Sequence, residues 1–415
     1  MKYRVNTKTI DGASFNLKDI VVNTPLQLSF RLSSEYNANI YIKREDLQVV
    51  RSYKIRGAYN LISSIHKDNK NIKITCASAG NHAQGVAFAA SLLKIKSIIF
   101  MPVTTPSQKI DRVKYFGGDF VSIKLVGPNF DECYKEAKVF TKENGYHFIH
   151  PFDDEKVIEG QATVGKEIFD KLKNIDYIIC PIGGGGLISG ISLYLKEKNK
   201  NIKIIGVEPS GAASMAESIK ANKIIKLKTV DTFVDGVATS RVGENTFNIV
   251  KNNVEKIKVI EEGQVATTMI ELYQNDGIIT EPAGALSISA LENIKTEIKG
   301  KNVVCILSGG NNDVLRYPEI MERSLVFKGL KHYFLIEFYQ KPGELKKFVN
   351  KALGVNDDIV RFEYIKKTSN ERGVALVGIE LKNKKDIDGL INRMDEHGIT
   401  YKKITKSDLL YNYII

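Results

Sequence analysis

One lysine of this chain stands where its amine could do chemistry. Lys54 lies near the start of RSYKIRGAYNLISSIHK (51–67), whose apolar residues recur at helical spacing from Ile55 onward. Ser52 occupies the position expected of an N-cap. A lysine at a helix N-terminus, beside Arg56, can have a lowered pKa and remain a free amine. Schiff-base chemistry requires such an amine, although an ordinary surface lysine is the simpler alternative for this stretch taken alone.

A second candidate segment, CASAGNHAQGVAFAA (76–90), places polar residues in a turn between a strand and a helix. Backbone N–H groups at a helix N-terminus suit a carboxylate. Asn81 can donate a hydrogen bond to a phenolate-type oxygen, and an ordinary turn with an Asn cap is the alternative. The candidate binding residues in this turn are Ser78, Gly80, Asn81 and His82.

Four consecutive glycines, Gly183 to Gly186, directly follow a strand-like run in CPIGGGGLISGI (180–191). Such a loop can turn tightly around a phosphate at the start of the next helix. The dinucleotide motif G-x-G-x-x-G does not fit, since Ile188 and Ser189 occupy its last place, and no P-loop motif occurs in this stretch. These spacings argue against NAD or ATP and against an NAD oxidoreductase.

Two further segments complete the set. VVCILSGGNND (303–313) presents Ser308 at the end of an apolar run, where its hydroxyl can meet a ring nitrogen; a plain strand-ending turn is the alternative. ITEPAGALSISAL (279–291) offers Glu281 before an Ala-rich helix, as an N-cap. A lysine, an asparagine, a phosphate loop and a serine together describe a pyridoxal-phosphate site.

The elements that position these residues alternate between apolar, β-branched runs and amphipathic helical segments. Because the runs are apolar on both faces, we predict an α/β catalytic domain with parallel sheets in two subdomains, and ligands at the carboxyl ends of the strands. The predicted strands are 39–46, 72–78, 96–102, 119–126, 146–152, 177–183, 202–209 and 303–310.

Near residue 325 the pattern changes to strand–helix–strand–strand–helix–strand, the order of a ferredoxin-like α+β unit, with a turn at 368–373. We predict a catalytic domain at 1–325, whose small subdomain covers roughly 50–155, and a second domain at 326–415. The segment RYPEIMERSLVFKG before this boundary reads as a connecting helix.

The bulk composition narrows the class of protein. The net charge is +12, but the lysines are scattered, so we expect no nucleic-acid partner. The polar N-terminus and the lack of long apolar runs predict no signal peptide, no membrane segment and a cytoplasmic location. None of the 4 cysteines has metal-ligand spacing, so we read them as reduced core residues.

These segments resemble the β-family (fold type II, tryptophan synthase β-like) pyridoxal-phosphate lyases. Within that group they are most similar to the biosynthetic threonine dehydratases, or threonine deaminases, in the short form with one ACT-like domain. The likeness covers most of residues 20 to 315 in order, and the C-terminal segment resembles the group's ACT-like regulatory domain. The segments that carry it are YIKREDLQ, SYKIRGAYN, SAGNHAQGVAF, GPNFDE, EGQATVGKEI, PIGGGGLISG, GVEPSGAASM, DGVATSRVG, EPAGA and SGGNND.

The resemblance implies roles for individual residues. Lys54 would form the covalent link to pyridoxal 5'-phosphate, Asn81 would contact the cofactor's 3'-oxygen, and Ser308 would face the pyridine nitrogen. The remaining cofactor contacts would come from Tyr53, Gly183, Gly184, Gly185, Gly186 and Leu187. The substrate-binding residues would be Ser78, Gly80, Asn81, His82 and Gln161.

The chain departs from the group's pattern at three positions. Tyr53 replaces a common Phe on the ring face, which we expect to be tolerated because both side chains stack. Ala79 stands where serine racemases carry a second catalytic serine, so racemisation is not expected. Glu208 and Ala212 match a cation site, but Ser214 replaces its third carboxylate, and we therefore assign no metal.

The implied activity is the deamination of L-threonine to 2-oxobutanoate and ammonia, by a threonine ammonia-lyase at the first step of isoleucine biosynthesis. The C-terminal domain would bind isoleucine as inhibitor and valine as opposing effector, in a homo-oligomer, by resemblance a tetramer; an assembly module without a ligand is the alternative. A catabolic serine/threonine dehydratase or another β-eliminating lyase is the main rival function. A non-catalytic amino-acid sensor is disfavoured, because Lys54, Asn81, the glycines and Ser308 are all retained.

Overall fold

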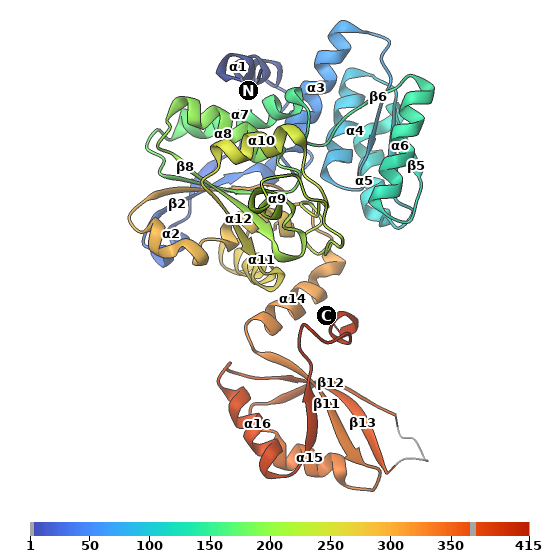
Figure 1. Ribbon diagram of the computed structural model, residues 1–415, viewed down its shortest axis with the longest axis vertical. Helices are drawn as coiled ribbons and strands as arrows, with labels where there is room; N and C mark the ends of the chain where they lie inside the picture. Colours follow the sequence, from blue (N-terminus) through green and yellow to red (C-terminus); the bar gives the residue numbers. More distant parts are fainter. Residues whose placement is uncertain (1–3, 366–370, 415) are drawn as a thin grey trace. The chain divides into compact units, whose positions relative to one another are not determined.

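The computed structural model describes residues 4–365 and 371–414. The chain divides into two compact units, Met1–Asp313 and Val314–Ile415 (Figure 1). The second unit includes the predicted connecting helix, α14 (Tyr317–Phe327), whose Glu322 accepts hydrogen bonds from Lys331 and Tyr333. The catalytic boundary at 325 and the subdomain limits at 50 and 155 remain predictions.

The larger sheet of the first unit has 6 strands in the order β1-β2-β10-β7-β8-β9. Strand β1 pairs antiparallel with β2, and the other neighbouring strands pair parallel, as predicted. Strand β7 is buried along its whole length, which explains its apolar sequence on both faces. The strands are β1 (Leu26–Leu28), β2 (Asn39–Arg44), β7 (Tyr177–Pro181), β8 (Lys203–Pro209), β9 (Lys256–Ile260) and β10 (Asn302–Leu307).

A smaller parallel sheet has 4 strands in the order β5-β4-β3-β6. Strand β6 is shorter than predicted, because the chain turns at His150, whose Nδ1 accepts the N–H of Asp153 at 2.8 Å. The strands are β3 (Ile74–Ala77), β4 (Ser97–Met101), β5 (Val121–Leu125) and β6 (His147–Phe148).

Helices connect and cover both sheets (Figure 1). Side chains of α7 and α8 pack with β7 and β8 in the main core, while α3 and α4 pack with β3 and β4 in a second core. The helices are α1 (Thr7–Asn16), α2 (Phe30–Tyr36), α3 (Lys54–Asp68), α4 (Asn81–Leu93), α5 (Ser107–Gly117), α6 (Phe130–Asn144), α7 (Glu155–Lys171), α8 (Gly186–Lys198), α9 (Ser214–Lys220), α10 (Glu244–Asn253), α11 (Glu262–Asp276), α12 (Pro282–Ser289) and α13 (Lys295–Ile298). Short 3-10 helices are η1 (Glu45–Leu47), η2 (Gly118–Phe120), η3 (Ser210–Ala212), η4 (Glu292–Ile294) and η5 (Val314–Arg316).

The second unit confirms the predicted ferredoxin-like order. Its antiparallel sheet runs β12-β13-β11-β14, and α15 and α16 form the two crossovers. Residues 368–370 of the predicted turn lie outside the described part of the chain. The elements are β11 (Lys331–Tyr339), α15 (Glu344–Ala352), β12 (Asp358–Tyr364), β13 (Arg372–Glu380), α16 (Asp386–Glu396), β14 (Thr400–Lys403) and α17 (Tyr411–Ile414).

All four cysteines are free and buried, in agreement with their reading as core residues. Within residues 4–365 and 371–414, no helix has the length and apolar character needed to cross a bilayer.

Candidate active site

Three of the segments singled out in the sequence, those of Asn81, the glycines and Ser308, follow the carboxyl ends of β3, β7 and β10. The segments of Lys54 and Glu281 lead instead into the helices α3 and α12. Asn81, at the start of α4, donates from Nδ2 to Glu281 Oε1 at 2.7 Å. Its Oδ1 accepts from Nδ2 of Asn311 at 2.8 Å. A residue that follows the small sheet therefore meets two loops of the large sheet, which places the candidate site between the two sheets.

Lys54 is the first residue of α3, and its Nζ donates to the carbonyl oxygen of Pro151 at 2.9 Å. Loss of solvent around the amine lowers the pKa of Lys54 to about 8, against the opposing charge of Glu281. The ammonium lies 5.4 Å from the ring centroid of Tyr53. Lys54 is therefore the partly desolvated, easily neutralised amine that the sequence suggested.

The predicted N-cap role of Ser52 is wrong. The N-cap position is Tyr53, without a side-chain cap, and buried Ser52 instead pairs with Gly309 in an isolated β-bridge. Tyr53 also donates its N–H to the carbonyl of Ser308 at 3.2 Å. The chain just before Lys54 is thus tied to the strand end that carries Ser308, and this tie takes the place of a cap.

The glycine loop requires glycine because other groups pack against it. A Cβ at Gly184 would lie 2.3 Å from the ring of Phe152, and Gly185 has φ +93°. Thr246 Oγ1 donates to the carbonyl of Gly184 at 2.6 Å. The helix α8 begins at Gly186, so N–H groups of its first turn lack helical acceptors and can bind an anion.

The predicted carboxylate turn leads into α4, whose N-cap position is Gly80, without a side-chain cap. Ser78 Oγ accepts the N–H of Gly80 at 3.2 Å. His82 Nε2 lies 3.0 Å from the carbonyl of Ile149, so Nε2 carries the proton. Burial, reinforced by the charge of Lys54, lowers the pKa of His82 to about 3, and the ring is neutral.

Ser308 and Gln161 lie in different surroundings. Ser308 is buried after β10, and its Oγ donates to the carbonyl of Ala283 at 3.2 Å. Gln161 Oε1 accepts the N–H of Gly57 at 3.2 Å, where α7 packs on α3. The contact of Gln161 is one of helix packing, and its substrate role stays a prediction.

Glu281 has a larger part in the site than the sequence suggested. It stands at the N-cap position of α12, but its side chain makes no capping hydrogen bond. The carboxylate instead accepts the hydrogen bond from Asn81. Burial, together with the nearby charge of Asp235, raises the pKa of Glu281 to about 7. The sequence showed its position but not its partner, because the two residues are 200 positions apart.

The sequence reasoning missed Pro151, Phe152 and Thr246. Pro151 accepts from Lys54, and the next residue, Phe152, packs on the glycine loop, so these two join the lysine to the candidate phosphate site. The sequence signal for them was the ending HPFDD (150–154) of a strand-like run, because the segments of Asn81, the glycines and Ser308 also follow such runs.

The candidate cation position is occupied by protein contacts. The carboxylate oxygens of Glu208 accept the N–H groups of Met215 and Ala216 at 2.8 and 2.7 Å. Burial raises the pKa of Glu208 to about 8. Ala212 belongs to η3. In the described part of the chain, no three His, Cys, Asp or Glu side chains gather closely enough to hold a metal ion.

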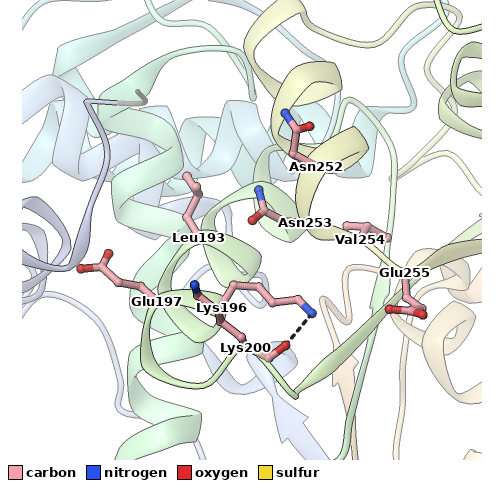
Figure 2. Close-up of a pocket in the computed structure, with 8 residues that line it drawn as sticks. All are labelled: Leu193, Lys196, Glu197, Lys200, Asn252, Asn253, Val254 and Glu255. Atoms are coloured by element: carbon pink, nitrogen blue, oxygen red, sulfur yellow. Dashed lines mark hydrogen bonds between the residues drawn. The ribbon is translucent and has the colours of Figure 1, made fainter. Parts of the chain in front are cut away.

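A surface hollow near the ends of α8 and α10 shares no residue with this site (Figure 2). Within it, Lys196 Nζ donates to the carbonyl of Lys200 at 3.2 Å. Its lining residues are Leu193, Lys196, Glu197, Lys200, Asn252, Asn253, Val254 and Glu255.

The residues present fit pyridoxal phosphate. An easily deprotonated amine suits its aldehyde, a glycine cradle that a Cβ would fill suits its phosphate, and a neutral hydroxyl suits its ring nitrogen. Comparison with protein families agrees. Residues 17–309 match the family described as "Pyridoxal-phosphate dependent enzyme", and residues 322–414 match the "C-terminal regulatory domain of Threonine dehydratase".

Comparison with individual proteins shows to which group of this family the chain belongs. The chain is 50% identical over 413 residues to the biosynthetic L-threonine dehydratase IlvA of Halalkalibacterium halodurans, covering 99% of this chain and 100% of the relative. The corresponding protein of Staphylococcus aureus is 50% identical, with full coverage of both chains. Among solved structures, the processed form of threonine deaminase isoform 2 from Solanum lycopersicum is 38% identical with a TM-score of 0.72, covering 77% of this chain and 94% of that one. The chain therefore belongs to the pyridoxal-phosphate-dependent enzymes and, within them, to the biosynthetic L-threonine dehydratases.

Proposed function

We propose that this protein is a threonine ammonia-lyase, which converts L-threonine to 2-oxobutanoate and ammonia at the first step of isoleucine biosynthesis. The observation that carries the proposal is similarity along the whole chain to biosynthetic dehydratases, regulatory domain included. A maize serine racemase is also similar, at 31% identity over 78% of this chain, but Ala79 stands where racemases carry their second catalytic serine.

The cofactor is pyridoxal 5'-phosphate, which supplies, when bound, an electron sink for the charge left at Cα. In the proposed arrangement Lys54 links to it, Asn81 meets its 3'-oxygen and Ser308 its ring nitrogen. Backbone N–H groups of Gly183 to Leu187 hold the phosphate. Tyr53 lies on the ring face.

Lys54 is the proposed catalytic base. Its lowered pKa of about 8 gives the amine a substantial neutral fraction near that pH, so Nζ can accept the Cα proton of the substrate. The start of α4, with Ser78, Gly80 and His82, is proposed to bind the substrate carboxylate through backbone N–H groups. Neutral His82 adds no charge there.

Ser308 limits the chemistry by being neutral. Unlike a carboxylate, its hydroxyl does not keep the ring nitrogen protonated. The negative charge at Cα is therefore stabilised less, and this favours rapid loss of the β-hydroxyl of the substrate. The hydroxyl leaves as water, and water then hydrolyses the released enamine–imine, so threonine is converted to 2-oxobutanoate and ammonia with no net water consumed.

The second unit is proposed to bind isoleucine as feedback inhibitor, with valine opposing it, and the whole to act as a tetramer. The support is the match of residues 322–414 to the regulatory-domain family and the ferredoxin-like order of the strands. Calorimetric titration of the full chain with L-isoleucine tests the effector, with L-alanine as control, and sedimentation measures the assembly. Equal binding of both amino acids, or none of either, would contradict the sensor role.

Substrate choice tests the proposed reaction. The holoenzyme is given L-threonine, L-serine or D-serine, and 2-oxobutanoate, pyruvate and the chirality of residual serine are measured. We expect the highest kcat/KM for L-threonine and no racemisation. A clear preference for L-serine would favour the catabolic dehydratase instead.

A further inference from the structure

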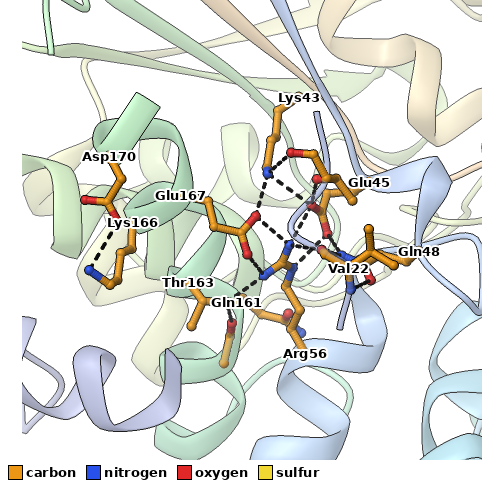
Figure 3. Close-up of polar contacts among 12 residues, drawn as sticks. Val22, Lys43, Glu45, Gln48, Arg56, Gln161, Thr163, Lys166, Glu167 and Asp170 are labelled. Carbon is orange, nitrogen blue, oxygen red and sulfur yellow. Dashed lines mark hydrogen bonds and ion pairs between the residues drawn. The ribbon is translucent and has the colours of Figure 1, made fainter. Parts of the chain in front are cut away.

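Two residues after Lys54, helix α3 carries a fully buried guanidinium (Figure 3). Arg56 donates from Nε and Nη2 to both carboxylate oxygens of Glu45, each at 2.8 Å. It donates from Nη1 and Nη2 to Glu167 at 2.6 and 2.9 Å, and from Nη1 to Thr163 Oγ1 at 3.0 Å. These bonds use all five N–H donors of the side chain, so its orientation is fixed.

A second basic side chain, Lys43, joins Arg56 and the two glutamates. Lys43, also fully buried, donates from Nζ to Glu167 and, at 2.8 Å, to the carbonyl of Thr24. We call Lys43, Glu45, Arg56 and Glu167 the Arg56 cluster; it consists of two basic and two acidic side chains. Burial alone would raise the pKa of Glu45, but the charges of Arg56 and Lys43 and the hydrogen bonds from Arg56 and Thr24 together lower it, so the carboxylate stays ionised.

The Arg56 cluster joins four elements around the start of α3. Lys43 comes from β2, Glu45 from η1, Arg56 from α3 and Glu167 from α7. Buried ion groups of this kind add little stability compared with apolar packing of the same volume. A rigid, doubly bidentate arginine does fix the rotation and position of the helix that carries it.

The backbone of Lys54 and Arg56 is itself closely packed against two neighbouring helices. A Cβ at Gly160 of α7 would lie 2.6 Å from the carbonyl oxygen of Arg56. A Cβ at Gly85 of α4 would lie 3.2 Å from the carbonyl oxygen of Lys54. The first turn of α3 is therefore in close contact with α4 and α7, and a small rotation of α3 would move the Lys54 amine.

We propose that Arg56, held by Glu45 and Glu167, is a positioning residue that sets the place of the Lys54 amine in the cofactor site. The proposal rests on the proposed role of Lys54 as the cofactor-binding lysine. It assigns the buried charges to the geometry of catalysis rather than to the stability of the fold.

The test is Arg56→Lys in the full-length holoenzyme, because lysine keeps the charge but cannot make the four carboxylate contacts. Visible circular dichroism of the bound cofactor, recorded before any amino acid is added, reports its orientation against the lysine. We expect that signal to weaken and kcat for L-threonine to fall about 100-fold. KM should change by less than about threefold, since substrate binding is not the interaction removed.

Arg31→Lys is the matched control. Arg31 donates from Nε and Nη2 to the carboxylate of Asp276 and from Nη1 to Glu35, and it joins α2 to α11. We expect this variant to keep the wild-type cofactor signal and to change kcat by less than about twofold, because the pair is partly exposed. Equal losses in the two variants would mean that Arg56 acts only on general stability, and would overturn the proposal.

Should Arg56→Lys fail to fold, Glu167→Gln applies the same test with a milder change, since the amide keeps one acceptor oxygen. A weakened cofactor signal with lowered kcat supports positioning, whereas wild-type values of both overturn it. The spectroscopic reading requires no turnover of threonine. Wild-type protein that binds the cofactor but leaves threonine unchanged would therefore refute the proposed substrate and leave the positioning question measurable.

Discussion

At the scale of single residues, the desolvation of Lys54 has a direct kinetic consequence. Its amine titrates at a pKa of about 8, well below the 10.5 of a free lysine side chain, and only the neutral form attacks an aldehyde. We therefore expect the rate at which apoprotein attaches pyridoxal phosphate to rise with pH and level off just above pH 8. Stopped-flow absorbance measures this rate; a rise that continues to pH 10 would contradict it.

Glu281 carries a second prediction, about stability. Its pKa is about 7 in the folded chain and near 4.5 when unfolded, so the native state holds its proton between these values and loses relative stability as pH rises through them. Glu281→Gln removes this dependence. Relative to wild type, the variant should gain about 3 kcal/mol of unfolding free energy between pH 4.5 and pH 7. Urea denaturation at both pH values measures the difference, and parallel pH profiles would refute it.

At the scale of elements, the glycine loop between β7 and α8 tolerates little added volume. Gly184→Ala would drive a Cβ into the Phe152 ring, so the loop must shift, and we expect cofactor affinity to drop at least about tenfold. Fluorescence titration of apoprotein with pyridoxal phosphate measures this. Gly12→Ala is the control: nothing lies within 4 Å of its Cβ in α1, and it should raise stability by about 0.5–1 kcal/mol without changing affinity. Unchanged affinity in Gly184→Ala would show that the loop does not hold the phosphate.

The strands that the sequence predicted include those buried on both faces, such as β7 and β10, because a short, continuous apolar run is typical of a strand covered by helices on each side. Strands β1 and β9 were missed. The first has only 3 residues at a sheet edge, and the second, KIKVI, is largely half-buried, with lysines between its apolar residues. Ser52 was misassigned as a cap because its real partner, Gly309, lies far along the chain.

In the candidate active site, too, the sequence predicted residues with a local pattern but not the contacts between distant segments. Lys54, Asn81, the glycines and Ser308 could be recognised from local pattern, each at the end of a strand or the start of a helix. The contacts that join them, Asn81 with Glu281 and Phe152 with Gly184, connect residues far apart in the sequence and leave no local pattern. Tertiary structure was needed for these.

At the scale of the whole molecule, regulation requires coupling between the two units. If isoleucine weakens threonine binding by some factor, an unreactive threonine analogue must weaken isoleucine binding by the same factor. We expect this reciprocity in calorimetric titrations of the full chain, each done with and without the other ligand. If a saturating concentration of the analogue leaves the affinity for isoleucine unchanged, the two binding sites are not coupled, and this prediction is contradicted.

The most direct test of the central claim is release of 2-oxobutanoate from L-threonine by cofactor-saturated protein, with and without L-isoleucine, beside Lys54→Ala. We predict turnover that isoleucine suppresses and that Lys54→Ala lowers by more than about 1,000-fold, because the base and the cofactor link are lost together. No turnover by the wild-type protein with bound cofactor, or full turnover by Lys54→Ala, would contradict the account.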